Sequence, residues 1–310
     1  MSQRLFIIGA SGYVGGTLAR HFVAENYSVT GLVRSADAAD RLRQSGIRPE
    51  FGDLESDIVN VLAIAKASDA VVYAAQVDFS REPLVVEALC QALAGTGKTL
   101  IFLSGSGVLM QRTEGAWSPD SYSEDDEFTA EPLAIPRVEA ERIVRTAAQK
   151  GVRAIVIRPP IIWGPGDNGP VAGAYRSIAK TGAACYVGSG LAVYGNVHSA
   201  DLADLFVLAL KRGRAGALYH AVAGEIPYRW IAEAVARDMG VPTRSVTMEE
   251  AIDIFGPFGA LLQSSCSRIR DSLTREELDW VPKQHDMLST VGEPRLRVLA
   301  DVPLKLENRT

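Results

Sequence analysis

Three glycines, Gly9, Gly12 and Gly15, recur at every third position directly after the apolar run Leu5–Ile8. Glycines at this spacing let the backbone turn tightly, so that its N–H groups approach a pyrophosphate at the positive end of the following helix. A glycine-rich turn that binds nothing is the alternative, but the strand before it and the helix after it favour the phosphate loop. The predicted contacts to the phosphates come from Gly9, Ser11, Gly12, Tyr13, Val14 and Gly15.

A second candidate binding element follows the β-rich run Ser28–Val33. Proteins that bind NAD usually carry an acidic residue about 20 positions after the glycine loop, which accepts hydrogen bonds from the ribose hydroxyls. Here Arg34 and Ser35 follow the run, and no carboxylate appears before Asp37. A guanidinium pairs well with a 2′-phosphate, and a hydroxyl adds a hydrogen bond. We therefore predict NADP rather than NAD, with a solvated surface arginine as the alternative.

These residues lie in a chain that alternates β-rich runs with longer helical stretches, which is typical of βαβ units. The runs are continuously apolar, as in a parallel sheet with helices on both faces. The sequence predicts an α/β fold, a Rossmann-type doubly wound parallel sheet. Its strands are expected at Leu5–Gly9, Ser28–Val33, Pro49–Phe51, Ala70–Ala75, Thr99–Ser104, Arg153–Arg158 and Ala217–Ala221. Its helices are expected at Gly12–Asn26, Ile58–Ala67, Pro83–Ala94, Ile135–Lys150, Ser199–Lys211 and Tyr228–Met239.

The regular alternation loosens after Arg158, where prolines and glycines crowd the next dozen positions. Such residues mark loops rather than another regular unit. We predict a Rossmann domain that binds NADP over residues 1–165. Residues 166–310 would form mainly a smaller, interleaved substrate-binding part, with segments that return to the sheet.

Composition narrows the partners. The 310 residues include 32 Lys and Arg against 37 Asp and Glu, a net charge of −5 without a basic block, which disfavours nucleic acid and anionic membranes. Three widely spaced cysteines favour neither a disulfide framework nor a metal site. No apolar run approaches the roughly 18 residues of a membrane span. A cytoplasmic protein with a small-molecule substrate is expected, and the acidic run Glu124–Glu127 is expected to be a solvated loop.

Several further segments, in this order, make the sequence similar to the short-chain dehydrogenase/reductase superfamily, in particular to its extended and atypical members related to epimerases and dehydratases. They are Gly52–Leu54, Val71–Ala75, Arg158–Pro160, Trp163–Gly166, Val197–Ala203 and Glu277–Pro282. The resemblance implies that Asp53 and Leu54 contact the adenine and that Ala74 and Ala75 line the ribose and diphosphate. It also implies that the backbone after Pro159 meets the nicotinamide, and that the protein is a homodimer.

The sequence departs from this family where the family's chemistry resides. The family uses a Ser or Thr to bind the substrate oxygen, a Tyr to transfer the proton, and a Lys one helical turn later. Here Leu133 stands at the Tyr position, Arg137 at the Lys position and Gly105 at the hydroxyl position. Leucine cannot transfer a proton. Arg137 is expected to hold the ribose, with a surface ion pair to Glu141 as the alternative.

Another group must therefore supply the proton. Ser104 and Ser106 flank the expected hydroxyl position and could orient a carbonyl or an imine. Asp167 could act as a general acid near an apolar pocket, or simply form a turn. Tyr122 is a further candidate for the proton donor, and the alternative is that it is an exposed loop residue without a catalytic role. Tyr175 and Tyr194 also remain open, with nothing in the sequence to rank them.

Together these features predict an NADP-dependent reductase that acts on a C=O, C=N or activated C=C bond of a small organic molecule. Hydride transfer depends mostly on positioning, because the cofactor supplies the chemistry. Two alternatives stay open. One is a non-redox isomerase, dehydratase or cyclase that retains NADP, and the other is a non-catalytic sensor of the NADP redox state.

Overall fold

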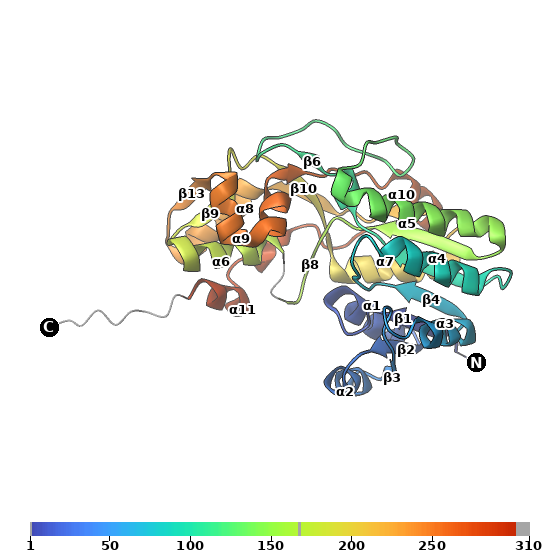
Figure 1. Ribbon diagram of the computed structural model, residues 1–310. Coiled ribbons are helices and arrows are strands. Elements are labelled where there is room, and N and C mark those ends of the chain that lie inside the picture. Colours follow the sequence, from blue (N-terminus) through green and yellow to red (C-terminus); the bar gives the residue numbers. More distant parts are fainter. Residues whose placement is uncertain (1, 167–168, 302–310) are drawn as a thin grey trace.

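The computed structural model describes residues 2–166 and 169–301. Its main sheet has seven parallel strands in the order β11-β7-β5-β4-β1-β2-β3, which confirms the predicted doubly wound α/β fold (Figure 1). The strands are β1 (Arg4–Ile8), β2 (Ser28–Val33), β3 (Arg48–Phe51), β4 (Ala70–Tyr73), β5 (Thr99–Leu103), β7 (Arg153–Arg158) and β11 (Leu218–His220).

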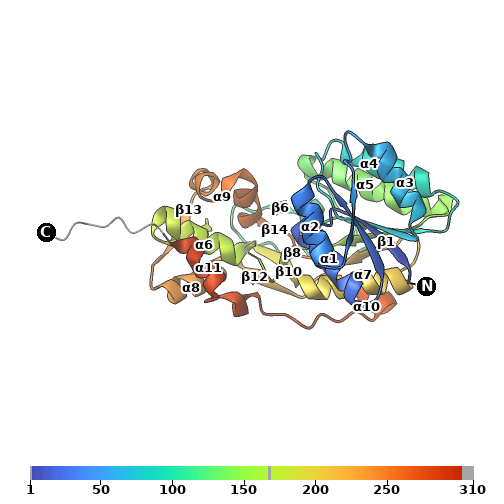
Figure 2. The same cartoon turned by 90° about the horizontal axis from the view of Figure 1, so that it is seen from below.

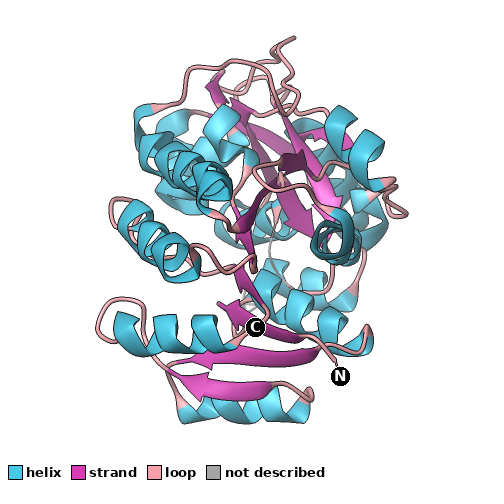
Figure 3. Cartoon of the chain, turned by 90° about the vertical axis from the view of Figure 1, so that its right-hand side faces the viewer, coloured by secondary structure: helices cyan, strands magenta, loops and turns pink. Residues whose placement is uncertain are grey.

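Helices cover both faces of this sheet, and the two faces divide the residues of each strand between them. In β1, Leu5 and Ile7 pack into one core, whereas Phe6 and Ile8 pack into the other. This double burial explains the continuous apolar runs. The first core includes α1 (Tyr13–Ala24), α2 (Ala36–Gln44), α7 (Ser199–Arg212) and α10 (Ser272–Leu278). The second includes α3 (Ile58–Ala67), α4 (Glu82–Leu93) and α5 (Ile135–Thr146), and Figures 2 and 3 show the resulting layers.

A smaller lobe, on the left of Figure 1, has a core of its own. Its helices are α6 (Pro170–Thr181), α8 (Tyr228–Met239), α9 (Met248–Gln263) and α11 (Pro294–Arg297). The parallel strands β9 (Ala184–Val187) and β13 (Thr243–Val246) pair within it. The 3₁₀ helices η4 (Met287–Thr290) and η5 (Val298–Ala300) lie near the carboxyl end of the described chain.

Short strands join the lobes. A three-stranded sheet contains β8 (Ile161–Trp163), β10 (Val193–His198) and β12 (Gly224–Pro227). A two-stranded one contains β6 (Gln111–Arg112) and β14 (Ser265–Cys266). The remaining 3₁₀ helices of the described chain are η1 (Ser106–Leu109), η2 (Pro132–Ala134) and η3 (Ala147–Lys150). The chain leaves the main sheet after β7, builds part of the small lobe, and returns to it at β11.

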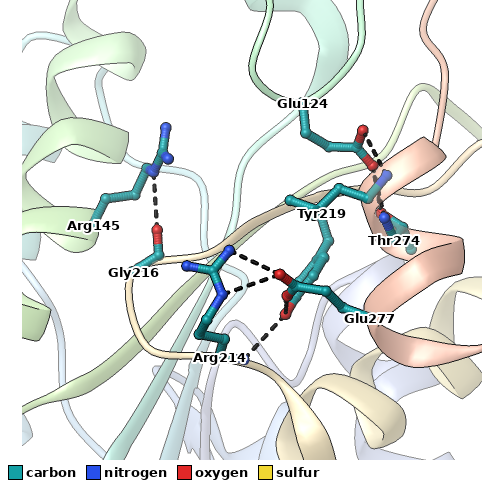
Figure 4. Close-up of polar contacts among 8 residues, drawn as sticks. Glu124, Arg145, Arg214, Gly216, Tyr219, Thr274 and Glu277 are labelled. Carbon is teal, nitrogen blue, oxygen red and sulfur yellow. Dashed lines mark hydrogen bonds and ion pairs between the residues drawn. The ribbon is translucent and has the colours of Figure 1, made fainter.

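The loop that carries Glu124 is packed against α10, so the expectation that its whole acidic run is solvated is wrong (Figure 4). The buried Glu124 carboxylate accepts hydrogen bonds from Thr274 N at 3.0 Å and from Thr274 Oγ1 at 2.8 Å. At the other end of α10, Glu277 accepts a 2.6 Å hydrogen bond from the Tyr219 hydroxyl and pairs with Arg214. Charge in this loop therefore compensates the free N–H groups at the start of a helix.

Candidate active site

One cavity of about 1230 Å³ runs along the carboxyl ends of β1, β4, β5 and β7 and continues between the two lobes. Parallel sheets of this type bind ligands at that edge, near the point where the strand order reverses. The wall includes the glycine loop at one end and residues of α6 and α9 at the other. The cavity is therefore long enough to hold two ligands side by side.

The glycine loop lies between β1 and α1, as expected. Gly9 has a φ of +94°, and a Cβ there would lie 2.5 Å from the Ala74 carbonyl oxygen, so only glycine fits. A Cβ on Gly15 would overlap the Gly9 carbonyl oxygen. No side chain caps α1 at Gly12, which leaves the N–H groups of the first helical turn for a ligand. This arrangement suits a pyrophosphate, and the predicted loop residues Gly9, Ser11, Gly12, Tyr13, Val14 and Gly15 all line the cavity.

At the adenosine end, Arg34, Asp53 and Leu54 line the cavity. The Arg34 side chain is 82% exposed, and its Nη1 lies 3.8 Å from Asp53 Oδ2. Backbone N–H groups of Ser56 and Glu55 lower the pKa of Asp53, which keeps the carboxylate ionised beside this guanidinium.

Ser35 has a structural task that the sequence analysis missed. It is the N-cap of α2, a helix absent from the predicted elements, and its Oγ accepts a 3.3 Å hydrogen bond from Ala38 N. Ser35 is not among the described residues that line the cavity. The Ser35 hydroxyl can still donate a hydrogen bond to a ligand, but its oxygen already accepts the one from Ala38 N.

Further along the edge, Ala74, Ala75 and Pro159 line the cavity as the resemblance implies. Ser106 N donates to the Pro159 carbonyl oxygen at 2.9 Å, which ties the end of β5 to the end of β7. A nicotinamide placed beyond the Ala74–Ala75 segment would meet this junction.

Arg137 points into the cavity wall from α5 but does not pair with Glu141, so that alternative is wrong. Its Nε lies 2.6 Å from Oε2 of the fully buried Glu82 on α4, and its Nη1 donates to the Leu103 carbonyl oxygen at 3.2 Å. The guanidinium also lies over the Phe102 ring. Burial raises the pKa of Glu82 to about 7, with Arg137 lowering it and Glu141 raising it.

Glu141 instead forms a buried ion pair with Arg158 of β7, whose Nε donates at 2.8 Å. The same carboxylate accepts a hydrogen bond from the Ser104 hydroxyl. Ser104 lies in the cavity wall, but its hydroxyl is directed to this internal pair. A carboxylate that accepts from both groups has most of its acceptor capacity satisfied, which stabilises a buried charge.

Ser106 lies beside two hydroxyls that come from distant parts of the chain. Ser267 Oγ donates to the Ser106 carbonyl oxygen at 2.8 Å and lies 3.0 Å from Ser106 Oγ. Burial raises the pKa of Tyr194, and hydrogen bonding with Ser267 and Ser106 offsets part of that rise. Ser106 and Tyr194 both line the cavity. No signal in the sequence pointed to Ser267, because its neighbourhood is created by the pairing of β14 and the bridge to β10.

Two other proton-donor candidates, Tyr122 and Tyr175, lie elsewhere. Tyr122 is outside the described cavity wall, where its hydroxyl accepts a 3.1 Å hydrogen bond from Gln111 Nε2. Tyr175 donates to Asp238 in the small lobe. Asp167 falls outside the residues that the structure describes. Leu133 lines the cavity with 37% of its surface exposed, so the position of the family tyrosine is an open apolar patch.

The helix that lines the far part of the cavity, α9, was not predicted. Helix α9 is interrupted at Gly256, with a φ of +75°, followed by Pro257. Lys180 Nζ donates to the Asp253 and Ile254 carbonyl oxygens at 2.9 and 2.7 Å, which replaces helical partners lost at the break. Glycine followed by proline is typical of a loop rather than of a helix interior, which explains why α9 was not predicted. Its residues in the wall are Ile254, Phe255, Gly256, Phe258, Gly259, Leu262 and Gln263.

Tyr228, at the start of α8, adds a further hydroxyl to the wall. Its Oη is buried and has no hydrogen-bond partner among the described residues. An unpaired buried hydroxyl costs about 1–3 kcal/mol, so a polar ligand atom or a water in the cavity would relieve it. Nothing in its sequence position distinguishes this tyrosine from a core residue.

The described residues form neither a metal site nor a membrane-spanning helix. No group of three or more His, Cys, Asp or Glu side chains is arranged to hold a metal ion. None of the described helices has the length and apolarity to cross a membrane. The three cysteines Cys90, Cys185 and Cys266 are free and buried.

The fold and the family match together define a protein of the extended short-chain dehydrogenase/reductase type. Residues 5–223 match the NAD dependent epimerase/dehydratase family, and the chain belongs to it. An uncharacterized protein of Schizosaccharomyces pombe is 35% identical over 300 residues, which cover 94% of this chain and 98% of that protein.

Two further relatives widen the comparison. A 4-hydroxy-2-methyl-3-oxo-4-farnesyl-3,4-dihydroquinoline-1-oxide ketoreductase of Stigmatella aurantiaca is 27% identical over 246 residues, 72% of this chain and 69% of that protein. Among solved structures, dTDP-glucose 4,6-dehydratase of Bacillus anthracis, in complex with NAD, superposes with a TM-score of 0.74 at 16% identity. The match covers 94% of this chain and 95% of that one, and it shows a shared fold.

Proposed function

We propose that the protein is an NADP-dependent reductase acting on a C=O, C=N or activated C=C bond of a small organic molecule, without the usual Tyr/Lys pair. One observation carries the proposal. A single cavity connects the glycine loop, Arg34 and Arg137 to a second compartment whose wall includes Ser106 and Tyr194. A bound NADPH supplies the hydride. The relative named as a ketoreductase supports this class of reaction.

The choice of NADP rests on Arg34. Its exposed guanidinium stands at the end of β2, the strand after the glycine loop, where an NAD enzyme usually has a carboxylate. The Asp53 carboxylate lies near enough to orient Arg34, but at 3.8 Å it leaves donors for a 2′-phosphate. The dehydratase of similar fold was solved with NAD, so direct comparison of the two cofactors is the necessary experiment.

The protein's own residues would act mainly by positioning. Arg137, held by Glu82 and by the Leu103 carbonyl oxygen, would donate to the nicotinamide ribose. The N–H groups of the first turn of α1 would fix the pyrophosphate. Placing a reactant and a cofactor at contact distance accounts for a large part of the catalysis of hydride transfer.

The test measures NADPH binding by titration calorimetry and NADPH consumption against product formed. We expect binding and a stoichiometry of one NADPH per product. Product formation without net consumption of NADPH would indicate an isomerase, dehydratase or cyclase. Tight binding without turnover of any carbonyl, imine or enone offered would indicate a redox sensor.

We also propose a homodimer. Helices α4 and α5 pack together on one side of the main sheet. Leu84 on α4 is 67% exposed and Ile135 on α5 is 57% exposed, so apolar side chains are available on this pair of helices. Light scattering on the purified protein should give twice the chain mass, and Leu84→Glu should shift it toward the monomer.

A further inference from the structure

We propose that Tyr194 replaces the missing family tyrosine as the group that binds and protonates the substrate oxygen, and that the substrate is a small ketone or aldehyde with an apolar body. This inference rests on the reductase function proposed above. It assigns the proton donor to β10, whereas the residue at the position of the family tyrosine, Leu133, lies on η2.

The position of Tyr194 is set by backbone contacts on both sides. Gly195 N donates to the Ser267 carbonyl oxygen at 2.9 Å, and Ser267 N donates to the Val193 carbonyl oxygen at 3.0 Å. Tyr194 thus lies directly beside Ser267 on the joined strands. A Cβ added at Gly107 would lie 3.4 Å from Tyr194 Oη, which places the hydroxyl over η1, just after the end of β5.

This end of β5 borders the expected nicotinamide site. Ser106 N is bound to the Pro159 carbonyl oxygen, and a Cβ on Gly195 would lie 3.3 Å from Pro160 Cβ. Tyr194 is therefore held against the same β5–β7 junction that the nicotinamide would meet. The Leu133 side chain offers no polar atom to a substrate oxygen, whereas Tyr194 has a hydroxyl.

The surroundings keep Tyr194 protonated. Burial raises its pKa above the ordinary tyrosine value, so at neutral pH the hydroxyl is a donor. Hydrogen bonding with Ser106 and Ser267 favours the ionised form and limits the rise. The two serine hydroxyls can therefore stabilise the tyrosinate formed when the proton leaves. They take over part of the task that a lysine performs in the family.

The substrate's carbonyl carbon accepts a hydride from the dihydronicotinamide of NADPH, which is oxidised to NADP⁺. As the C=O π bond breaks, its electron pair on oxygen takes the proton from Tyr194 Oη. The product is an alcohol, and Tyr194 regains a proton from water through the Ser106 and Ser267 hydroxyls.

The remaining wall indicates the substrate class. Its apolar side chains on α9, η2 and the segment after η1 include Phe255, Phe258, Leu262, Leu133 and Met110. The polar residues of this wall include Arg176, Lys180 and Gln263, and Lys180 is engaged with carbonyl oxygens at the α9 break. The unpartnered Tyr228 hydroxyl offers one additional hydrogen bond, close enough for Tyr194 to influence its pKa. Such a wall suits an aromatic or otherwise apolar carbonyl compound.

The test compares Tyr194→Phe with Tyr186→Phe, a matched tyrosine on β9 outside the described cavity wall. Benzaldehyde and phenanthrenequinone serve as carbonyl probes with NADPH. We expect Tyr194→Phe to lower kcat at least about 100-fold, the contribution of a positioned general acid, while the Kd for NADPH stays within twofold. Tyr186→Phe should behave as the unaltered protein. Full kcat in Tyr194→Phe would overturn the inference and leave the reductase function standing.

A second readout does not depend on turnover. 3-Fluorotyrosine is placed at position 194 or, as control, at 186, and fluorine NMR is recorded with NADP⁺ and then with added benzaldehyde. The resonance at 194 should shift with each addition, and that at 186 should not. An unmoved resonance at 194 while NADP⁺ binds would overturn the placement of Tyr194. Binding and shifts without NADPH oxidation by either probe would contradict the reductase function instead.

Discussion

Glu82 Oε2 lies 2.6 Å from Arg137 Nε, and the carboxylate has no exposed surface. Arg137, the cation at the family lysine position, is therefore paired with a carboxylate of the neighbouring helix α4. Both carboxylate oxygens of Glu82 lack any hydrogen bond of good geometry among the described residues. The pair thus places a charged carboxylate in the interior without further hydrogen bonds to stabilise it. The free energy of unfolding is therefore sensitive to the protonation of Glu82.

The first prediction concerns pH and stability. The pKa of Glu82 is raised from 4.5 to about 7 in the folded state, so between these values the folded protein holds a proton that the unfolded chain releases. The free energy of unfolding should therefore fall as the pH rises through this window, by about 3 kcal/mol from this group. Glu82→Gln should abolish this part of the slope. Urea unfolding at about pH 5 and about pH 8 measures it.

The control is Glu139→Gln on the exposed side of α5, where the pKa of Glu139 is lowered by hydrogen bonding with Arg142. This variant should keep the slope of the unaltered protein. An equal slope in Glu82→Gln and in the unaltered protein would show that Glu82 is ionised across the whole range.

The second prediction concerns cofactor selection. Arg34→Ala should weaken NADP binding by about 10- to 100-fold, the worth of a charge-assisted hydrogen bond to a phosphate, and should change NAD binding little. Titration calorimetry with both cofactors measures the two affinities. Arg43→Ala, on the exposed face of α2, is the control. Equal losses for NADP and NAD would refute the cofactor assignment.

The third prediction concerns the altered catalytic positions. Leu133→Tyr combined with Arg137→Lys restores the family residue types, yet we expect no gain in kcat/KM for carbonyl probes. Lysine cannot reproduce the forked contact of Arg137 with Glu82 and the Leu103 carbonyl oxygen. Steady-state assays with NADPH test this. A gain of more than about tenfold would mean that the ordinary family mechanism is merely impaired here.

The fourth prediction concerns the break in α9. Lys180→Met removes the donor to the Asp253 and Ile254 carbonyl oxygens and should lower the free energy of unfolding by about 1.5–3 kcal/mol. Cleavage near Gly256 in limited proteolysis should become faster. Lys66→Met, on the exposed face of α3, should do neither. Unchanged proteolysis in Lys180→Met would show that the chain at the Gly-Pro break is stable without the Lys180 hydrogen bonds.

Periodicity and the glycine spacing predicted the nucleotide-binding half well, because each element there has a local cause. The strands Ser28–Val33 and Arg153–Arg158 and the helix Ile58–Ala67 lie where the apolar pattern placed them. Helix α2 was missed because its residues are mostly polar and only Ser35 marks its start.

The catalytic end was harder to predict, because its residues meet only through tertiary structure. Ser106, Tyr194 and Ser267 lie on η1, β10 and the segment after β14, and no spacing in the sequence relates them. Arg137 lines the cavity, and the alternative of an ion pair with Glu141 rested only on a spacing of four residues. The true partner, Glu82, lies on a neighbouring helix, where burial rather than sequence distance decides the pairing.

The return of the chain to the main sheet at β11 has a consequence during synthesis. Strand β7 pairs with β11, which the ribosome delivers only after β8, α6, β9, β10 and α7. Until then β7 is an open edge with unpaired backbone groups, beside an apolar face awaiting α7. The nascent Rossmann half therefore exposes this unpaired edge while residues 159–217 are synthesised, and chaperone demand should peak in that interval.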